Sequence, residues 1–257
     1  MTLRFFETHA HLDYLKEFPL EEILQKSKTA GVEKIMTIAV DPQNQDAALV
    51  LAEKYDHIYC TQGLHPHEAR FWNDELESKI LKNLASPKVK AIGEIGLDYH
   101  YDHSPRDNQR LAFEAQLEIA IKSKLPIVIH TREAEEDTAA ILKNFLPRMK
   151  KRGVIHCFTS NETLANFALQ EGFSLGFNGI ITFKAAENVR DILKITPLDR
   201  ILLETDCPFL APIPYRGREN HPFYLPYVAK KIADVKGISI EELAPMLWDN
   251  AEKVFFS

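Results

Sequence analysis

Six side chains scattered along the chain are of the types that bind divalent metal ions: His9, His11, Glu94, His130, His156 and Asp206. His9 and His11 are two positions apart, so on an extended strand both imidazoles project from one face and can reach one ion. Glu94 lies in the apolar sequence AIGEIGLD, where an ionised carboxylate is buried only if it is paired or bound to metal. The pattern predicts a metal site assembled from distant segments.

Four imidazoles and two carboxylates are more ligands than one tetrahedral zinc ion needs. We therefore expect two ions bridged by a carboxylate. Zn²⁺, Mn²⁺, Fe²⁺, Co²⁺ and Ni²⁺ accept this mixture of donors, whereas so many imidazoles disfavour Ca²⁺, and Mg²⁺ fits only a partly water-filled site. Zn²⁺, Mg²⁺ and Mn²⁺ are the candidates we retain. Sites with two metal ions are typical of hydrolases. In such an enzyme Asp206 and Glu94 would be the catalytic carboxylates.

The elements that must position these residues follow from short apolar runs alternating with helical stretches. Eight runs are predicted as strands, over residues 5–11, 34–40, 58–64, 89–97, 126–130, 153–158, 173–177 and 201–206. Between them, apolar residues recur at helical spacing. Eight units over 257 residues average about 32 residues, the length of a βα pair. We expect one domain over residues 1–257, folded as a TIM-type (β/α)₈ barrel rather than an open doubly wound sheet.

The predicted ligands fall on strands one, four, five, six and eight of this barrel. His130, His156 and Asp206 each stand at the C-terminal end of their run, and His11 ends the first. The C-terminal face is where a barrel holds its active site. The three longest loop candidates, residues 64–73, 98–107 and 209–222, also follow strand ends. Surface or hydrogen-bonded histidines would have to produce five independent coincidences, so we favour a metal site.

Residues next to these ligands are weaker candidates for roles in catalysis or substrate binding. Glu204 would hold a ligand imidazole in its tautomer, the alternative being a buried carboxylate paired with lysine or arginine. His65, in GLHPH, would donate to a substrate phosphate or leaving group, or else stabilise its loop. Arg132 shares the strand face of His130 and could bind phosphate. Asp98 is a weaker candidate at the rim.

Two arginines in the loop after the last strand, Arg216 and Arg218, could contact the backbone of a nucleic acid. Their alternative is an ordinary solvated loop. Cys157 alternates away from His156, so we expect it in the core.

Composition narrows the class of protein. The chain is 45% hydrophobic and 26% charged, as globular proteins are. Its net charge of −6 argues against binding polyanions by bulk charge. No apolar run reaches the roughly 18 residues of a membrane helix, and the N-terminus has no signal-peptide core. Three separated cysteines, an odd number, are typical of reduced thiols. We expect a cytoplasmic protein with no membrane association and no obligate protein partner.

The chain resembles the TatD family of metal-dependent hydrolases over nearly its whole length. The resemblance rests on THAHLD, GLHPH, AIGEIGLDYH, PIVIHTR, IHCF, LGFNGIITFK, ILLETDCPFLAP, RGRENHP and NAEKVFF, in family order. It implies one metal held by His9, His11, Glu94 and Asp206. It implies a second held by Glu94, His130 and His156, with Glu94 as the bridge. His100, Ser160, Cys207 and His221 depart from the usual family residues, and none of these changes removes a ligand.

The resemblance also implies an activity. The family hydrolyses phosphodiester bonds of DNA, including exonuclease-like degradation of single strands, with proposed roles in DNA repair and fragmentation. The leading interpretation is an exodeoxyribonuclease-like enzyme that prefers single strands and has DNA as its substrate. The alternative keeps the site but cleaves a C–N or ester bond, as in a cyclic amide or aminoacyl-tRNA. A non-catalytic binding module is disfavoured by the full ligand set and by the net charge.

Overall fold

The computed structural model describes residues 3–257. Eight strands form one parallel sheet in which each pairs with the next along the chain. They are β1 (Phe5–Ala10), β2 (Val32–Thr37), β3 (Ile58–Gln62), β4 (Val89–Asp98), β5 (Ile127–Arg132), β6 (Gly153–Ile155), β7 (Ser174–Phe177) and β8 (Ile201–Leu203). Most of their residues are buried, because helices cover the outside of the sheet and side chains fill its inside.

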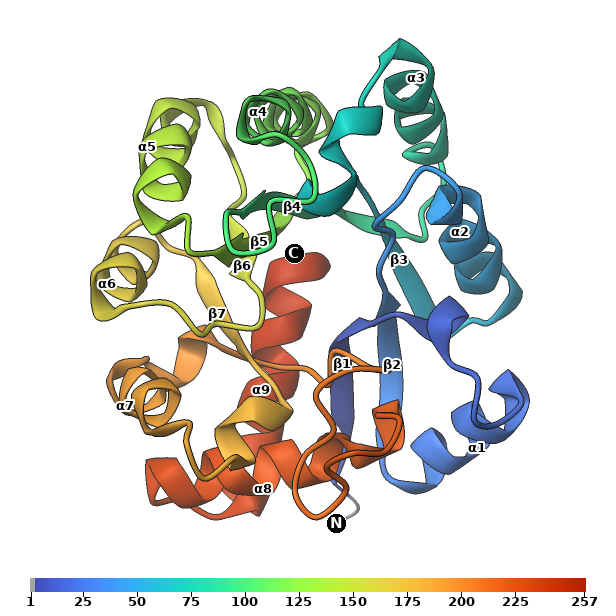
Figure 1. Cartoon of the computed structure of the whole chain (residues 1–257). Coiled ribbons are helices and arrows are strands. Elements are labelled where there is room, and N and C mark those ends of the chain that lie inside the picture. Colours follow the sequence, from blue (N-terminus) through green and yellow to red (C-terminus); the bar gives the residue numbers. More distant parts are fainter. Residues whose placement is uncertain (1–2) are drawn as a thin grey trace.

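The sheet closes on itself between its first and last strands. Ala10 forms a parallel bridge with Cys207, just after β8. Deeper in the barrel, Thr8 Oγ1 donates a hydrogen bond of 3.0 Å to the carbonyl of Leu203. Figure 1 shows the resulting ring of strands with helices around it. The expected TIM-type (β/α)₈ barrel is confirmed.

The helices around the ring follow their strands in sequence. They are α1 (Leu20–Thr29), α2 (Asn44–Lys54), α3 (Asp74–Asn83), α4 (Arg106–Ser123), α5 (Glu135–Phe145), α6 (Glu162–Gln170), α7 (Glu187–Ile195), α8 (Leu225–Lys236) and α9 (Ile240–Phe255). Side-chain caps set several starts: Asn73 and Asn161 accept backbone N–H groups at α3 and α6, and Ser239 with Glu242 forms a capping box at α9. No helix within residues 3–257 has the length and apolar character to cross a membrane.

Helix α9 closes the end of the barrel at which the strands begin. It lies across the middle of the ring in Figure 1, behind the strands. Phe6, near the start of β1, packs against Trp248 and Phe255 with ring centroids 6.0 and 6.1 Å apart. These rings join apolar side chains that point into the barrel, such as Val128 and Leu202. The inside of the barrel is therefore a packed core, and only its C-terminal face is open for a site.

Several strands end earlier than their apolar runs predicted. The run over 153–158 is a strand only to Ile155, and the run over 201–206 only to Leu203. The chain leaves the extended conformation because Cys157 and Asp206 have left-handed φ values of 45° and 60°. His11, His156 and Asp206 therefore lie just beyond strand ends, on backbone that turns over the mouth of the barrel.

We expect Phe255→Ala to lower the free energy of unfolding by about 3–5 kcal/mol, because it would leave a cavity between α9 and the barrel. Phe255 is 2% exposed. Met246→Ala, on the same helix at 42% exposure, is the matched control and should change stability by less than about 0.5 kcal/mol. Urea unfolding followed by circular dichroism measures both. Equal, small losses in the two variants would show that α9 is not part of the core.

Candidate metal centre

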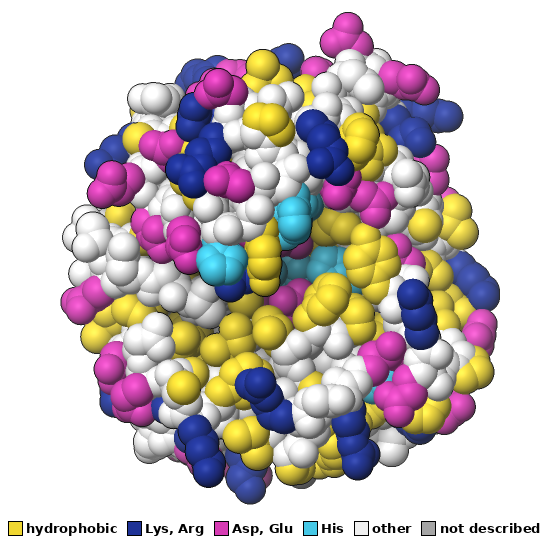
Figure 2. Space-filling model, in the orientation of Figure 1, with side chains coloured by type: hydrophobic (Ala, Val, Ile, Leu, Met, Phe, Trp, Pro, Cys, Tyr) yellow, Lys and Arg dark blue, Asp and Glu magenta, His cyan; other side chains and the backbone are white. Residues whose placement is uncertain are grey.

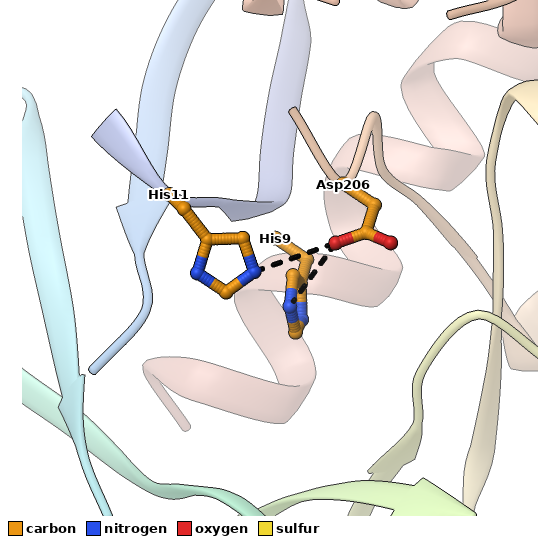
Figure 3. A group of neighbouring side chains, drawn as sticks. All are labelled: His9, His11 and Asp206. Atoms are coloured by element: carbon orange, nitrogen blue, oxygen red, sulfur yellow. Dashed lines mark ion pairs between the residues drawn. The ribbon is translucent and has the colours of Figure 1, made fainter. Parts of the chain in front are cut away.

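The first group of candidate ligands joins the two strands at the seam of the barrel. His11 Nε2 lies 3.4 Å and His9 Nε2 3.7 Å from the same oxygen of Asp206, Oδ1 (Figure 3). Backbone hydrogen bonds hold the three together: the N–H of Asp206 donates to the carbonyl of His9 at 2.9 Å, and that of His11 to Cys207 at 2.8 Å. The left-handed turn at Asp206 directs its carboxylate back toward β1.

Glu94 is the centre of the second group. Its Oε1 lies 2.8 Å from His156 Nε2 and 3.0 Å from His130 Nδ1, while its Oε2 lies 3.2 Å from His9 Nε2. The side chain is 3% exposed. One carboxylate thus contacts histidines of both groups, which is the geometry required of a bridging ligand.

Buried ring nitrogens without hydrogen bonds indicate what the centre is built to hold. Within residues 3–257, both nitrogens of His9, both of His156 and Nδ1 of His11 are buried and lack a hydrogen-bond partner. Buried polar atoms are normally paired. Donor atoms of His9–His11–Asp206, of His9–Glu94–His156 and of His65–Glu94–His130 each lie within 4.8 Å of one another. Nitrogen and carboxylate donors so arranged fit divalent cations of the zinc and manganese type.

The charges of the centre favour ionised carboxylates. Burial alone would raise the pKa of Glu94, but the neighbouring histidines, His156 foremost, hold it well below its ordinary value. The pKa of Asp206 is lowered in the same way, with His11 and His9 overcoming its burial. The two expected metal-binding carboxylates are therefore negative, as ligands must be.

Glu204 lies behind His156. Its Oε1 is 3.6 Å from His156 Nδ1 and accepts the backbone N–H of Cys157 at 2.7 Å. No lysine or arginine of the described chain pairs with it, which removes the alternative considered from the sequence. A Cβ on Gly176 would lie 2.3 Å from Glu204 Oε2, so glycine is required there to make room for the carboxylate.

Two further buried carboxylates contact the centre. Glu7 was not recognised from the sequence, and Asp98 was considered only as a weaker candidate at the rim. Glu7 accepts the backbone N–H groups of His9 and Thr205 at 3.0 and 2.9 Å, and burial raises its pKa to about 8. Asp98 is fully buried, with Oδ2 2.9 Å from His67 Nε2 and 3.0 Å from His130 Nε2. The sequence did contain a signal for Glu7. It lies within the apolar run FFETHA, where, as for Glu94, a carboxylate is expected to be buried only with a partner. The position of Asp98 at the end of its run indicated the rim of the barrel but not its contacts with His67 and His130.

His65 faces Glu94 in a defined tautomer. It precedes the 3₁₀ helix η2 (Pro66–Phe71), and its Nδ1 accepts the backbone N–H of His67 at 3.1 Å. The ring proton of the neutral imidazole therefore lies on Nε2, 3.4 Å from Glu94 Oε1. Burial lowers the pKa of His65 to about 3. In this tautomer His65 presents an N–H group that donates a hydrogen bond to the centre, and not a free lone pair.

The two groups form the floor of a cavity of about 690 Å³. Figure 2 shows histidines gathered in a central hollow of this face, with hydrophobic side chains beside them. Arg132 and Cys157 line the cavity. The expectation that Cys157 lies in the core is wrong, because its left-handed backbone turns it toward the mouth.

Arg216 and Arg218 are not brought to the cavity. Both are exposed on the loop after β8, and the guanidinium of Arg216 lies 3.8 Å from the ring centroid of Phe183.

Comparisons with known proteins show which family the chain is similar to. A family model described as "TatD related DNase" matches residues 6–256. An "Uncharacterized metal-dependent hydrolase YabD" of Bacillus subtilis is 41% identical over 97% of this chain and 98% of its own. A protein of Rahnella named "3'-5' ssDNA/RNA exonuclease TatD" is 35% identical over 91% of each chain. The crystal structure of YjjV, a TatD homolog from Escherichia coli, superposes with a TM-score of 0.92 at 32% identity, covering both chains fully.

We expect Glu94→Ala to lose divalent metal from both groups, because one carboxylate contacts both. His130→Ala should reduce only the metal beside Glu94 and His156. His57→Ala replaces a half-buried histidine distant from the ligands and is the control that should keep the full complement. Inductively coupled plasma mass spectrometry of each purified variant gives the stoichiometry. A full complement in Glu94→Ala would contradict the bridge.

Proposed function

This chain belongs to the TatD family of metal-dependent hydrolases, and from that premise we propose that it hydrolyses phosphodiester bonds at the ends of single-stranded DNA. The observation that carries the proposal is the Glu94 carboxylate, which lies within 3.2 Å of ring nitrogens from both ligand groups. Divalent cations held by these residues would neutralise and orient a phosphodiester on an otherwise acidic protein. The Rahnella relative named as a single-strand exonuclease supports the same substrate class.

The donor groups divide naturally between two ions. His9, His11, Glu94 and Asp206 would hold one, and Glu94, His130 and His156 the other. Bound divalent ions, of which Zn²⁺, Mn²⁺ and Mg²⁺ are the candidates, would polarise the phosphoryl group and lower the pKa of water at the site toward about 7. Glu204 would keep His156 in the tautomer that presents Nε2 to the cavity.

Asp206 would act as the general base. It lines the cavity as well as contacting His9 and His11, so its carboxylate can accept the proton of the attacking water. Glu94 is more deeply enclosed, and its role would be to hold the centre together.

His65 and Arg132 would bind the phosphate. His65 Nε2–H, directed toward Glu94, would donate to a phosphoryl or leaving oxygen. Arg132 lines the same cavity and would add a charge-assisted contact. The exposed Arg216 and Arg218 would contact only the part of the DNA strand that lies outside the cavity. An enzyme of this kind would serve DNA repair or fragmentation in the cytoplasm, where its cysteines would stay reduced.

We expect EDTA to abolish cleavage of a labelled single-stranded oligonucleotide, and Mn²⁺, Mg²⁺ or Zn²⁺ to restore it. Asp206→Asn should reduce the single-turnover rate about 10²–10⁴-fold, because an amide can touch the ion but cannot accept a proton. Metal content is measured on the same samples. A near-normal rate in Asp206→Asn with both metals bound would exclude the general-base role. Cleavage of amides or aminoacyl esters, with oligonucleotides untouched, would replace the phosphodiesterase by the alternative hydrolase.

We expect His65→Ala to lower the single-turnover rate about 10–100-fold while the metal content is unchanged, because a hydrogen bond to a charged oxygen is lost. His65→Gln should recover part of the rate, since its amide N–H can donate from a similar position. A loss of metal in His65→Ala would instead identify His65 as a ligand.

A further inference from the structure

One wall of the cavity is apolar and adjoins the Asp206 ligand group. It consists of Phe209 and Leu210, in the loop after β8, and Ile180, in the 3₁₀ helix η4 (Gly179–Thr182). Phe209 is 52% exposed. Of the large hydrophobic side chains left exposed within residues 3–257, only Phe209 and Tyr101 line this cavity. An exposed aromatic surface beside a charged centre is suited to a ligand that is partly apolar and partly ionic.

Hydrogen bonds fix this wall relative to the centre. The N–H of Phe209 donates to the carbonyl of Asp206 at 2.9 Å, and Asn220 Nδ2 donates to the carbonyl of Phe209 at 2.6 Å. A Cβ on Gly179 would lie 2.0 Å from the carbonyl oxygen of Leu210, so glycine allows the two loops to touch. The wall is therefore held in place, as a preorganised binding surface should be.

Phe209 has a ring face available, whereas Tyr101 does not. The centroid of Phe209 is 6.1 Å from that of His11 at 68°, an edge contact, and no other ring in the described residues contacts it. Tyr101 already carries the guanidinium of Arg132 at 4.7 Å and is stacked with His103 at 5.5 Å. Phe209 is thus the aromatic surface onto which a ligand can stack while remaining next to His11.

Positive charge is scarce in the same cavity. Arg132 is its one lysine or arginine within residues 3–257, while Asp41 and Glu68 also line it. A nucleic-acid strand attracted by charge alone would make few favourable contacts in this cavity apart from those with bound metal. Flat apolar groups, in contrast, gain from stacking whatever their sequence.

From these observations, and resting on the proposed phosphodiesterase function, we infer that Phe209, flanked by Ile180 and Leu210, is a nucleobase subsite. The base of the terminal nucleotide stacks on Phe209, and its phosphodiester lies at the His9–His11–Asp206 group. An unpaired terminal base can turn away from its neighbour to reach Phe209, whereas a paired base is held by the opposite strand, so the subsite favours single-stranded ends. Recognition by stacking is indifferent to which base is present.

The test compares ligands that differ only by a base. Isothermal titration of the metal-loaded enzyme gives Kd for deoxyadenosine 5′-monophosphate and for 2-deoxyribose 5-phosphate. We expect the nucleotide to bind about ten-fold more tightly. Cleavage of an oligonucleotide should slow by a similar factor when both terminal nucleotides lack their bases.

Variants then assign the difference to Phe209. Phe209→Leu should bring both ratios close to one, and Phe209→Trp should preserve them, because indole also offers a stacking face. Phe71→Leu is the matched control: Phe71 is 46% exposed and lies outside this cavity, so both ratios should stay at the parental value.

The two proposals fail in different ways. Kd and cleavage ratios near one in the parent, with oligonucleotides still cut, would overturn the subsite and leave the phosphodiesterase standing. Parental ratios retained in Phe209→Leu would also overturn it. No cleavage of any oligonucleotide, with amides or esters hydrolysed, would overturn the function, and the Kd ratio would still decide whether bases bind at Phe209.

Discussion

The molecule is organised around a carboxylate that could not be buried alone. Glu94 lies on a central strand at 3% exposure, where an unpaired negative charge would be prohibitively costly. His9, His130 and His156 approach its two oxygens from β1, β5 and the turn after β6. Both ring nitrogens of His9 and of His156 lack hydrogen-bond partners, and bound cations would supply them. The barrel brings these strands to one point, where bound cations would complete the charge balance.

Much of the architecture follows from the sequence because barrel strands are read from short-range patterns. Buried parallel strands are continuous apolar runs, and polar ligands at their ends stand out against them. His130 and Asp206 could be placed at the mouth on that ground alone. The ends of the strands could not be placed, because nothing local shows that Cys157 and Asp206 adopt left-handed backbone. Each turn is tied to a distant part of the chain: the N–H of Asp206 donates to the carbonyl of His9, and that of Cys157 to the carboxylate of Glu204.

The parts of the site that could not be predicted are those defined by contacts that only the folded chain creates. Asp98 ends an apolar run like many surface carboxylates, and only the fold places His67 and His130 on either side of it. Phe209 is likewise an unremarkable loop residue until Gly179 and Asn220 fix its loop against the centre. His65 could be suspected from its motif, but its tautomer depends on a backbone N–H two residues away. Composition and periodicity contain none of these relations.

The seam between β1 and β8 has a consequence for the order of assembly. His9 and His11 are nearly 200 positions away from Asp206 in the sequence, yet they meet it across the bridge between Ala10 and Cys207. Contacts between such distant residues form late, since closing a long loop precedes any gain from the contact. Until this seam closes, the His9–His11–Asp206 group is incomplete, so the proposed metal centre depends on closure of the barrel.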